Sequence, residues 1–442
     1  MYAIRPVGRP YAWGSLTRLQ SLFSSDPLLS GVRGPLAEAW FSAHPVWPSR
    51  LEAPVAEGLT LPDLIRRDPQ RMMGVRDSAR FGPVLPFLLK VIAARIPLSL
   101  QVHPAGFLAR EGFNREEARG VPRSSADRSF PDPVEKNEMV LAVDRFELSS
   151  GFAPVRRILE VLALVDHPLA RRMLAAMRRD VEDASASAAD RHRDSGFVRR
   201  PPQRRALEVL TAGRQDMQGV PMAFEKARAR AENGYDALVL DHAILAGAAF
   251  PDDAGVMALL LMNPIRLEPG DCAYIPAGTL HTYLKGTAVE IMTNSDTVLR
   301  AGLTVKPTHV DQVLGCVSFS PRMPEDSGVS SGAAGWVAAT GGAGVRVMAP
   351  AIDEFMLMAG DLPSAAAGTA VVRIPGRRPR IVLCLSGQVE CRTDGDRCTL
   401  AMGEAVFVPA GDGDVRVSTA PAAGETAQGR CDCRFVVAAT GQ

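Results

Sequence analysis

A short pattern that occurs twice in the sequence constrains the fold of this chain more than any other feature. Residues 267–278 (LEPGDCAYIPAG) are echoed far downstream by residues 400–411 (LAMGEAVFVPAG). Each copy reads as a turn that contains glycine and an acidic residue, followed by a short apolar strand that ends at proline. Two copies of this strand–turn–strand unit predict two β domains of similar construction.

The repeated unit is typical of the cupin, a small double-sheet β-barrel of the jelly-roll type. The copies differ directly after their shared Pro-Ala-Gly, because the first continues to His281 and the equivalent position of the second is Asp414. No histidine follows His309 in the sequence. An imidazole ligand can therefore lie at the mouth of the first barrel, and we expect the second barrel to be degenerate and structural.

Helical signals interrupt the β pattern in the middle of the chain. Residues 155–245 are rich in Ala, Arg, Leu and Glu, and Ile158, Val161, Leu162 and Val165 recur at helical spacing. The predicted fold class is therefore mainly β with a helical insertion, namely two cupin-type jelly-roll β-barrels plus an α-helical domain.

This prediction divides the chain into four segments. Residues 1–154 form the N-terminal part of the catalytic cupin region, 155–247 the helical insertion, 248–330 the remainder of the catalytic barrel, and 331–442 the degenerate barrel. Local patterns predict buried strands at 84–93, 97–102 and around 254–262, and a helix over 61–73 with Thr60 as its N-cap. Residues 180–200 are polar and are expected to form a loop or a solvated helix.

Composition excludes several classes of function. Hydrophobic residues make up 46% and charged residues 22% of the 442 residues, which is typical of a globular protein. The formal net charge of +1 gives no general attraction for nucleic acid. No apolar run reaches the ~18–20 residues of a membrane span, and no signal peptide is visible. The seven cysteines match no paired zinc pattern, so we expect reduced thiols and a cytoplasmic location.

Four residues are candidate metal ligands. Gln101 and His103 are two apart in a strand-like run, so their side chains should point to the same face. Glu138 leads into an apolar strand, and His281 follows the first copy of the repeat. One amide, one carboxylate and two imidazoles suit Zn²⁺ with an open coordination position. Spacing alone indicates only that the four could meet.

Several stretches of residues 1–310 resemble type I mannose-6-phosphate isomerases, in the order of that family. These stretches are residues 11–15 (YAWGS), 37–45 (AEAWFSAHP), 85–90 (LPFLLK), 97–104 (PLSLQVHP), 136–139 (KNEM) and 289–304 (VEIMTNSDTVLRAGLT). The resemblance implies a cytoplasmic isomerase that interconverts mannose 6-phosphate and fructose 6-phosphate, in mannose metabolism and GDP-mannose supply. A small sugar phosphate is then the partner, with no nucleic acid and no membrane, and we expect a monomer or weak dimer.

The resemblance also implies the roles of individual residues. One zinc ion per chain is held by Gln101, His103, Glu138 and His281, and Arg300 is the active-site arginine. Further positions that line the substrate cleft are Lys90, Ser99, Lys136, Glu290, Asp296 and Lys306. We assign Lys90, Ser99 and Lys306 to the phosphate. Lys90 lies in an apolar run, so its ammonium needs an anionic partner, either the ligand or an internal carboxylate.

An aldose–ketose isomerase moves a proton between C2 and C1 of the open-chain sugar. The developing enediolate must be stabilised, which Zn²⁺ can do as a Lewis acid, and a general base must carry the proton. Glu290 and Lys136 are the candidates for this base. Arg300 stays charged at neutral pH, so we expect it to act as a fixed positive charge that Asp296 orients.

The sequence departs from the family pattern near the expected site. Ala105 and Gly106 follow His-Pro where the family usually has Asp first, and Glu135 replaces a histidine. These changes leave open the rate, the substrate preference and two alternative functions. One alternative is a non-catalytic sugar-phosphate-binding cupin. The other is a different metal-dependent cupin enzyme such as an Fe(II) oxygenase, although Gln101 as a fourth ligand argues against the usual two-histidine, one-carboxylate set.

Overall fold

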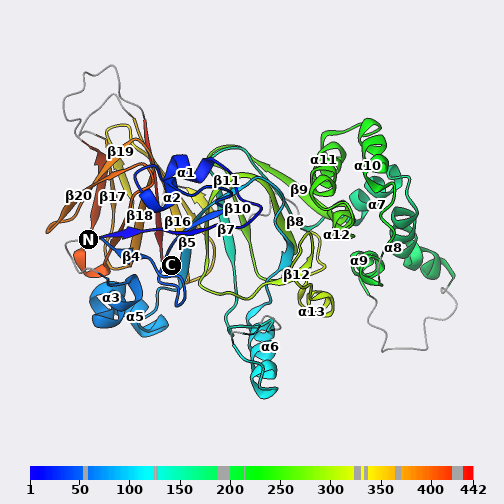
Figure 1. Ribbon diagram of the computed structural model, residues 1–442, viewed down its shortest axis with the longest axis horizontal. Helices are drawn as coiled ribbons and strands as arrows, with labels where there is room; N and C mark the ends of the chain where they lie inside the picture. The colour runs from blue at the N-terminus through cyan, green and yellow to red at the C-terminus, as the bar shows by residue number, and fades with distance from the viewer. Residues whose placement is uncertain are drawn as a thin grey trace.

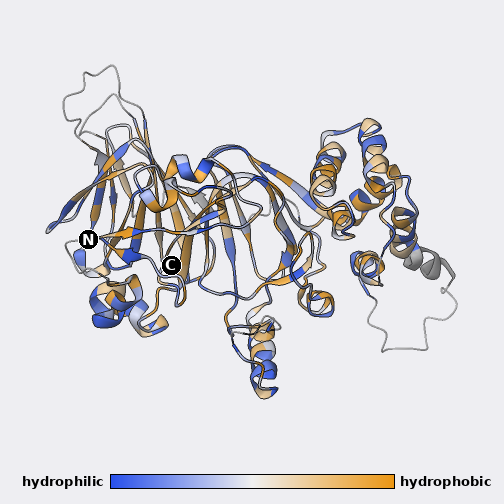
Figure 2. Cartoon of the chain, viewed as in Figure 1, coloured by the Kyte–Doolittle hydropathy of each residue, from blue (hydrophilic) through white to orange (hydrophobic). Residues whose placement is uncertain are grey.

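The protein consists of a long β body with a group of helices at one end (Figure 1). The computed structural model describes residues 1–52, 58–123, 125, 128–186, 200–213, 215–322, 330–332, 337–363, 370–420 and 432–441. Hydrophobic residues follow the strands of the body and alternate with hydrophilic ones around the helices (Figure 2). The chain is thus mainly sheet, with helices concentrated in the middle of the sequence.

A ten-stranded antiparallel sheet forms the half of the body next to the helices. Its strands are β2 (Val7–Arg9), β3 (Glu38–Ser42), β5 (Phe87–Ala94), β6 (Leu100–Val102), β7 (Glu138–Ala142), β8 (Phe146–Phe152), β9 (Met262–Leu267), β10 (Cys272–Ile275), β11 (His281–Thr293) and β12 (Leu299–Gly302). The long strand β11 pairs with β5 and β7 through its second half, and with β6 and β8 through its first. Because β11 lies between these strands, it brings together chain segments that are far apart in the sequence, from β5 to β8.

The other half contains an eight-stranded and a five-stranded sheet. Their strands are β1 (Tyr2–Arg5), β4 (Arg50–Leu51), β13 (Ser330–Gly332), β14 (Ala338–Thr340), β15 (Gly344–Ala349), β16 (Met356–Leu362), β17 (Val371–Ile374), β18 (Arg380–Ser386), β19 (Gln388–Arg392), β20 (Arg397–Ala401), β21 (Ala405–Val408), β22 (Val415–Thr419) and β23 (Cys433–Ala439). A shared core of buried residues joins the two sheets. The N-terminal strand β1 pairs with β21, which the sequence patterns did not predict.

Both copies of the repeated pattern fold into the same turn. The Glu268 amide donates a hydrogen bond to Asp271 Oδ2 at 3.0 Å, and the Ala401 amide donates one to Glu404 Oε2 at 2.9 Å. The strands β10 and β21 follow these turns. Asp414, the counterpart of His281, accepts a hydrogen bond from the Gly376 amide at 2.8 Å and pairs with Arg373. Asp414 therefore holds the loop at Gly376, and its side chain serves a local structural contact.

The middle of the chain folds into helices, as its periodicity predicts. They are α7 (Val155–Leu164), α8 (Pro168–Ala186), α9 (Pro202–Thr211), α10 (Val220–Ala229), α11 (Gly234–Ala249) and α12 (Gly255–Ala258). The residues at helical spacing, from Ile158 to Val165, are buried in one core that also includes Leu100 and Leu299 of the sheet. Within the described part of the chain, none of the helices has both the length and the apolar character that a membrane span needs.

Two local predictions were wrong. Residues 255–261 form the helix α12 and the 3₁₀ turn Leu259–Leu261 rather than a strand, because periodicity cannot distinguish a short apolar run in a helix from one in a strand. The helix expected over 61–73 is divided into α3 (Leu61–Arg67) and α4 (Pro69–Met73), since a residue before proline disfavours the helical conformation. Thr60 caps α3 as predicted.

The two other predicted strands agree with the structure. The expected strands at 84–93 and 97–102 correspond to β5 and β6. Most of the polar stretch 180–200 lies outside the described residues. The other helices are α1 (Arg18–Leu22), α2 (Pro27–Ser30), α5 (Val75–Phe81), α6 (Gly106–Ala118) and α13 (Val310–Cys316), with a 3₁₀ turn at Ala410–Asp412.

Candidate active site

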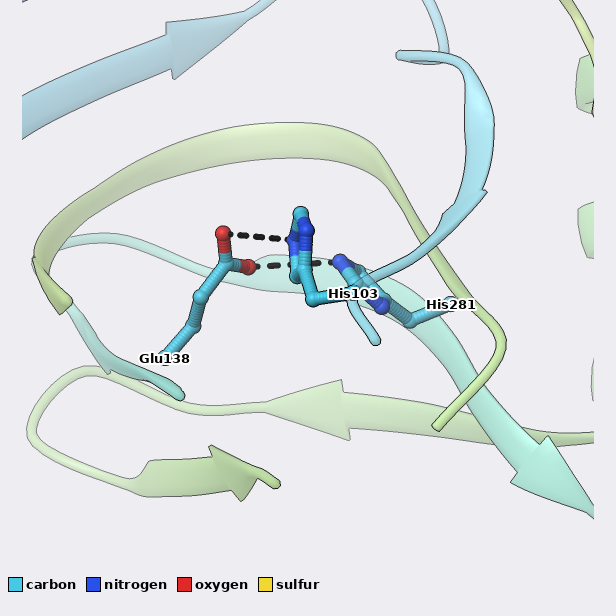
Figure 3. A group of neighbouring side chains, drawn as sticks. All are labelled: His103, Glu138 and His281. Atoms are coloured by element: carbon cyan, nitrogen blue, oxygen red, sulfur yellow. Dashed lines mark ion pairs between the residues drawn. The ribbon is translucent and has the colours of Figure 1, made fainter. Parts of the chain in front are cut away.

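Three of the candidate metal ligands converge in the interior of the ten-stranded sheet (Figure 3). His103 Nε2 lies 2.9 Å from Glu138 Oε1, and His281 Nε2 lies 3.2 Å from Glu138 Oε2. His103 follows β6, Glu138 begins β7 and His281 begins β11, so strand pairing holds all three side chains. Their exposed fractions are at most 2%.

Gln101 lies directly beside this group. It is the cross-strand neighbour of His281, and its Nε2 lies 3.2 Å from His281 Nε2. Its Oε1 accepts a hydrogen bond from the Ser99 hydroxyl at 3.1 Å. A half-turn of the amide exchanges its nitrogen and oxygen and so turns the oxygen toward the imidazoles. The structure thus brings all four candidate ligands together.

The protonation of the imidazoles shows that this group fits a cation. His103 Nδ1 lies 2.8 Å from the Thr297 carbonyl oxygen, and His281 Nδ1 lies 2.9 Å from the Thr279 carbonyl oxygen. Since a carbonyl can only accept, both Nδ1 atoms carry the proton, and both Nε2 atoms face Glu138, which is the tautomer that frees Nε2 to bind a metal. His103 Nε2 is buried and has no hydrogen-bond partner. Lone pairs facing a carboxylate repel it unless a cation lies between them.

The pKa shifts of His103 and Glu138 favour the forms of these two side chains that bind a metal. Burial, and secondarily Lys136, lowers the pKa of His103 to about 4, so its ring is neutral at pH 7. Burial alone would raise the pKa of Glu138, but His103 and Lys136 outweigh it and hold that pKa well below its usual value. Lys136 Nζ lies 3.1 Å from Glu138 Oε1, and the Tyr283 hydroxyl donates to Glu138 Oε2 at 3.1 Å. An anionic carboxylate and two neutral imidazoles are the forms that bind metal.

A cavity of about 400 Å³ opens above this group. Gln101 and Glu138 line it. All seven residues predicted for catalysis or substrate binding also line it: Lys90, Ser99, Lys136, Glu290, Asp296, Arg300 and Lys306. The structure therefore brings all seven side chains around one cavity.

Lys90 finds its anionic partner inside the protein. Its Nζ lies 3.0 Å from Glu290 Oε2, and the two residues are cross-strand neighbours in β5 and β11. Burial would lower the pKa of Lys90, but Glu290 and Glu38 outweigh it and raise that pKa. The pKa of Glu290 is also raised, chiefly by burial. Of the two partners that the sequence left open for Lys90, the structure provides the internal carboxylate.

The expectation that Asp296 orients Arg300 was wrong. Asp296 Oδ2 lies 3.0 Å from His44 Nε2 instead. His44 Nδ1 accepts hydrogen bonds from the Val46 and Trp47 amides, each at 3.2 Å, so Nε2 carries the proton and donates to Asp296. The sequence analysis gave His44 no role, because nothing in the spacing of the two residues indicates that they meet.

Arg300 and Lys306 form a positive end of the cavity. Among the described residues, no carboxylate lies within ion-pair distance of either side chain. Burial lowers the pKa of Arg300. The pKa of Lys306 is lowered by burial and then by Arg300, which indicates that the two cations lie close together. Two adjacent cations without carboxylate partners suit an anionic ligand.

The departures from the family pattern lie at the start of α6. Glu135 Oε2 accepts a hydrogen bond from the Gly106 amide at 2.7 Å, at a helix N-terminus whose N-cap, Ala105, offers no side-chain acceptor. Glu135 Oε1 accepts from Asn137 Nδ2 at 3.1 Å. Glu135 is not part of the cavity lining. Its carboxylate thus serves as a helix cap and does not enter the candidate site.

Several cavity residues were not predicted. Tyr11, Trp13, Glu38, Trp40 and Tyr283 all line the cavity. Trp40 Nε1 donates to Glu38 Oε2 at 2.6 Å, and the ring of Trp40 lies under Lys90 Nζ at 5.0 Å. Two of the family-like stretches, residues 11–15 and 37–45, contain four of these side chains and were the available signal. No pattern assigned a role to individual residues in them.

Comparisons with known proteins agree with this geometry. Residues 1–155 match the family model described as phosphomannose isomerase type I, catalytic domain. The mannose-6-phosphate isomerase of Salmonella typhimurium is 31% identical over 411 residues, which cover 92% of this chain and 94% of that protein. Mannose-6-phosphate isomerase 1 of Arabidopsis thaliana is 28% identical over 430 residues, with 91% and 88% covered.

Solved structures of the same family share the fold. The crystal structure of the Salmonella typhimurium enzyme bound to fructose 6-phosphate and zinc matches with a TM-score of 0.75 and 28% identity, and covers 100% of both chains. The crystal structure of the apo form of that enzyme matches with a TM-score of 0.74. The sequence identity, the coverage and the buried His–Glu–His group lead to one conclusion: this chain belongs to the type I phosphomannose isomerase family.

Proposed function

We propose that this chain is a zinc-dependent aldose–ketose isomerase that interconverts mannose 6-phosphate and fructose 6-phosphate. The observation that carries the proposal is the convergence of His103, Glu138 and His281 below a cavity with a positive end. Relatives named mannose-6-phosphate isomerase and a similar structure that holds fructose 6-phosphate and zinc support it. A merely sugar-phosphate-binding protein would not need a buried metal-binding group.

His103, Glu138, His281 and the amide oxygen of Gln101 would hold the zinc ion. The Nδ1 contacts of both imidazoles with carbonyl oxygens, the lowered pKa of Glu138 and the unsatisfied Nε2 of His103 support this assignment. When bound, the ion supplies Lewis-acid stabilisation of negative charge that develops on the substrate oxygens. Thr297, Thr279, Tyr283 and Lys136 orient the ligands through the contacts described above.

Glu290 is our choice for the proton carrier between C1 and C2. Its carboxyl group lines the cavity, is buried, and has a raised pKa, which brings it closer to the operating pH than an ordinary carboxyl. Lys136, the other candidate, is engaged by Glu138 at 3.1 Å. Lys90 would then stabilise the carboxylate form of Glu290 and so limit how far its pKa rises.

Arg300 and Lys306 provide the positive charge for the anionic parts of the substrate. Their charges are not neutralised by a described carboxylate, whereas that of Lys90 is neutralised by Glu290. We therefore assign the phosphate to Lys306, and the enediolate or the neighbouring oxygens to Arg300. Once the Gln101 oxygen is turned toward the imidazoles, its amide nitrogen faces the Ser99 hydroxyl and can donate to it, so we assign Ser99 to the ligand set rather than to the phosphate. Asp296, fixed by His44, borders the cavity as a further acid–base group.

The architecture supports a more detailed description as well. We propose that the two sheet systems are two cupin-type jelly-roll barrels, the second without a metal, and that helices α7 to α11 form a helical domain between segments of the first. The described cysteines carry thiols rather than disulfides, which agrees with a cytoplasmic enzyme. A monomer or weak dimer, working in mannose metabolism and GDP-mannose supply, completes the proposal.

The direct test is turnover of mannose 6-phosphate by the purified chain. Formation of fructose 6-phosphate can be followed by a coupled assay or by NMR, with added zinc and with chelator. Zinc-dependent turnover supports the proposal. Absence of turnover with zinc would favour the non-catalytic alternative, and bound iron together with oxygen consumption would favour the oxygenase.

A further inference from the structure

Arg9 is held in a cage of aromatic rings beside the cavity. It ends β2, and its guanidinium carbon lies 3.9 Å from the ring centre of Trp47, 5.2 Å from that of Tyr11 and 5.4 Å from that of Trp40. Among the described residues, no carboxylate forms an ion pair with Arg9. A cation that contacts three aromatic faces and no acid keeps its full charge while its position is fixed.

The cage connects Arg9 to the cavity through Tyr11. Arg9 Nε and Nη2 both donate to the Tyr11 hydroxyl oxygen, at 3.1 and 2.9 Å. Because that oxygen accepts two charge-assisted hydrogen bonds, the phenolic hydrogen must point elsewhere, and no described residue accepts it. Tyr11 lines the cavity and Arg9 does not. The tyrosine therefore offers a polarised O–H donor whose direction is set from outside the cavity.

Tyr11 also lies next to the positive end of the cavity. Lys306 Nζ is 5.1 Å from the centre of its ring. Burial and then Arg300 lower the pKa of Lys306, Glu38 opposes them, and Arg9 lowers it slightly further, so three cations and one carboxylate share this region. A hydroxyl bound to one cation, on a ring that a second cation approaches, suits a dianionic phosphate better than a neutral sugar hydroxyl.

We propose that Arg9 is a specificity-determining positioning residue for the phosphate group of the substrate. It fixes the Tyr11 hydroxyl as a phosphate donor beside Lys306, and adds a third positive charge to that of Arg300 and Lys306. The inference rests on the proposed function, because it assumes that the ligand of this cavity carries a phosphate. It assigns Arg9 no part in proton transfer.

Two variants, Arg9→Gln and Tyr11→Phe, test this inference. We expect each to raise the KM for mannose 6-phosphate, Arg9→Gln by about tenfold, with kcat changed less than twofold, since a charge-assisted hydrogen bond to the phosphate is weakened. Because Arg9 acts through Tyr11, the double variant should be little worse than Arg9→Gln alone. Arg9→Lys keeps the charge but not the paired donors, and should restore part of the affinity.

A binding measurement separates this role from simple support of the fold. Inorganic phosphate is titrated into the zinc-loaded protein and followed by tryptophan fluorescence, because Trp13, Trp40 and Trp47 lie at this end of the molecule. The dissociation constant should rise about tenfold in Arg9→Gln and remain unchanged in Arg66→Gln. Arg66 is a matched control, since its side chain is 59% exposed on α3 and, among the described residues, forms an ion pair with Asp63 alone.

The two levels of the proposal fail in different ways. Absence of mannose 6-phosphate turnover in the unaltered protein would refute the proposed function, while the phosphate titration would still decide the role of Arg9. Unchanged KM and unchanged phosphate affinity in Arg9→Gln would overturn the inference, as would a loss of kcat at constant KM. If Arg9→Gln does not fold, Tyr11→Phe, which keeps the aromatic ring, decides in its place.

Discussion

Lys90 Nζ lies 3.0 Å from Glu290 Oε2, and both side chains are less than a tenth exposed. This buried ion pair forms one wall of the candidate active site. Removing one partner leaves the other charge without compensation in the interior, which is more costly than removing both. A change to either residue is therefore expected to alter both the free energy of unfolding and the turnover.

Lys90→Met should lower the free energy of unfolding by about 3–5 kcal/mol. The double variant Lys90→Met/Glu290→Gln should be less destabilised than the sum of the two single variants, because no buried charge remains unpaired. Urea unfolding of the four proteins in the cycle measures this coupling. Strictly additive losses would show that the pair does not interact as its geometry indicates.

Glu135→Ala should destabilise the protein by about 1 kcal/mol, because the N-terminus of α6 loses its acceptor for the Gly106 amide. Ala105→Asp in the same background should recover most of that loss, since residue 105 is the N-cap and has extended backbone angles. Turnover should change little in both variants, because Glu135 does not line the cavity. A large fall in kcat on Glu135→Ala would place this carboxylate in the reaction after all.

Arg300→Ala should lower kcat by about 10²–10³-fold while zinc remains bound, because a fixed positive charge on the reacting oxygens is lost. Arg300→Lys should restore part of the rate, since it keeps the charge but not the planar donors. Steady-state kinetics and metal analysis on the same samples check both statements. Near-normal kcat in Arg300→Ala would remove this residue from the mechanism.

Asp253→Ala should raise the KM by loosening the loop that carries Lys306. Asp253 Oδ2 accepts hydrogen bonds from the amides of Leu303 at 2.6 Å and Thr304 at 3.4 Å. Leu303 has a φ of 54°, a conformation that costs a non-glycine residue about 1–2 kcal/mol and needs such support. The prediction is an increase of about three- to tenfold in KM with kcat largely retained, from an estimated loss of roughly one hydrogen bond. An unaltered KM would show that the loop holds its shape without Asp253.

The candidate site was more predictable from the sequence than its surroundings. His281 could be located because the repeated pattern ends just before it, and Asp414 marks the same place in the copy without an imidazole. Gln101, His103 and Glu138 needed the family resemblance, because only strand pairing around β11 brings them together. The sequence predicted that Lys90 needs an anionic partner but could not identify Glu290. That contact depends on the register between β5 and β11, which the sequence of a single strand does not determine.

The unpredicted contacts join segments that are distant in the sequence. His44 meets Asp296, and strand β1 meets β21, through folding of the whole chain rather than through any local pattern. The helix at residues 255–258 replaces the predicted strand, because a short apolar run fits both elements. Sequence patterns therefore predicted which residue types the site uses, while tertiary packing decided which side chains face one another.

Zinc titration of the metal-stripped protein tests the central claim most directly. Turnover of mannose 6-phosphate is measured after each small addition of zinc to the unaltered protein and to His281→Ala. We predict that stripping abolishes turnover, that activity rises linearly and levels off at a single equivalent of zinc, and that His281→Ala neither retains the ion nor recovers. Full turnover of the stripped protein, or normal zinc binding by His281→Ala, would contradict the assignment of His103, Glu138 and His281 as the metal site.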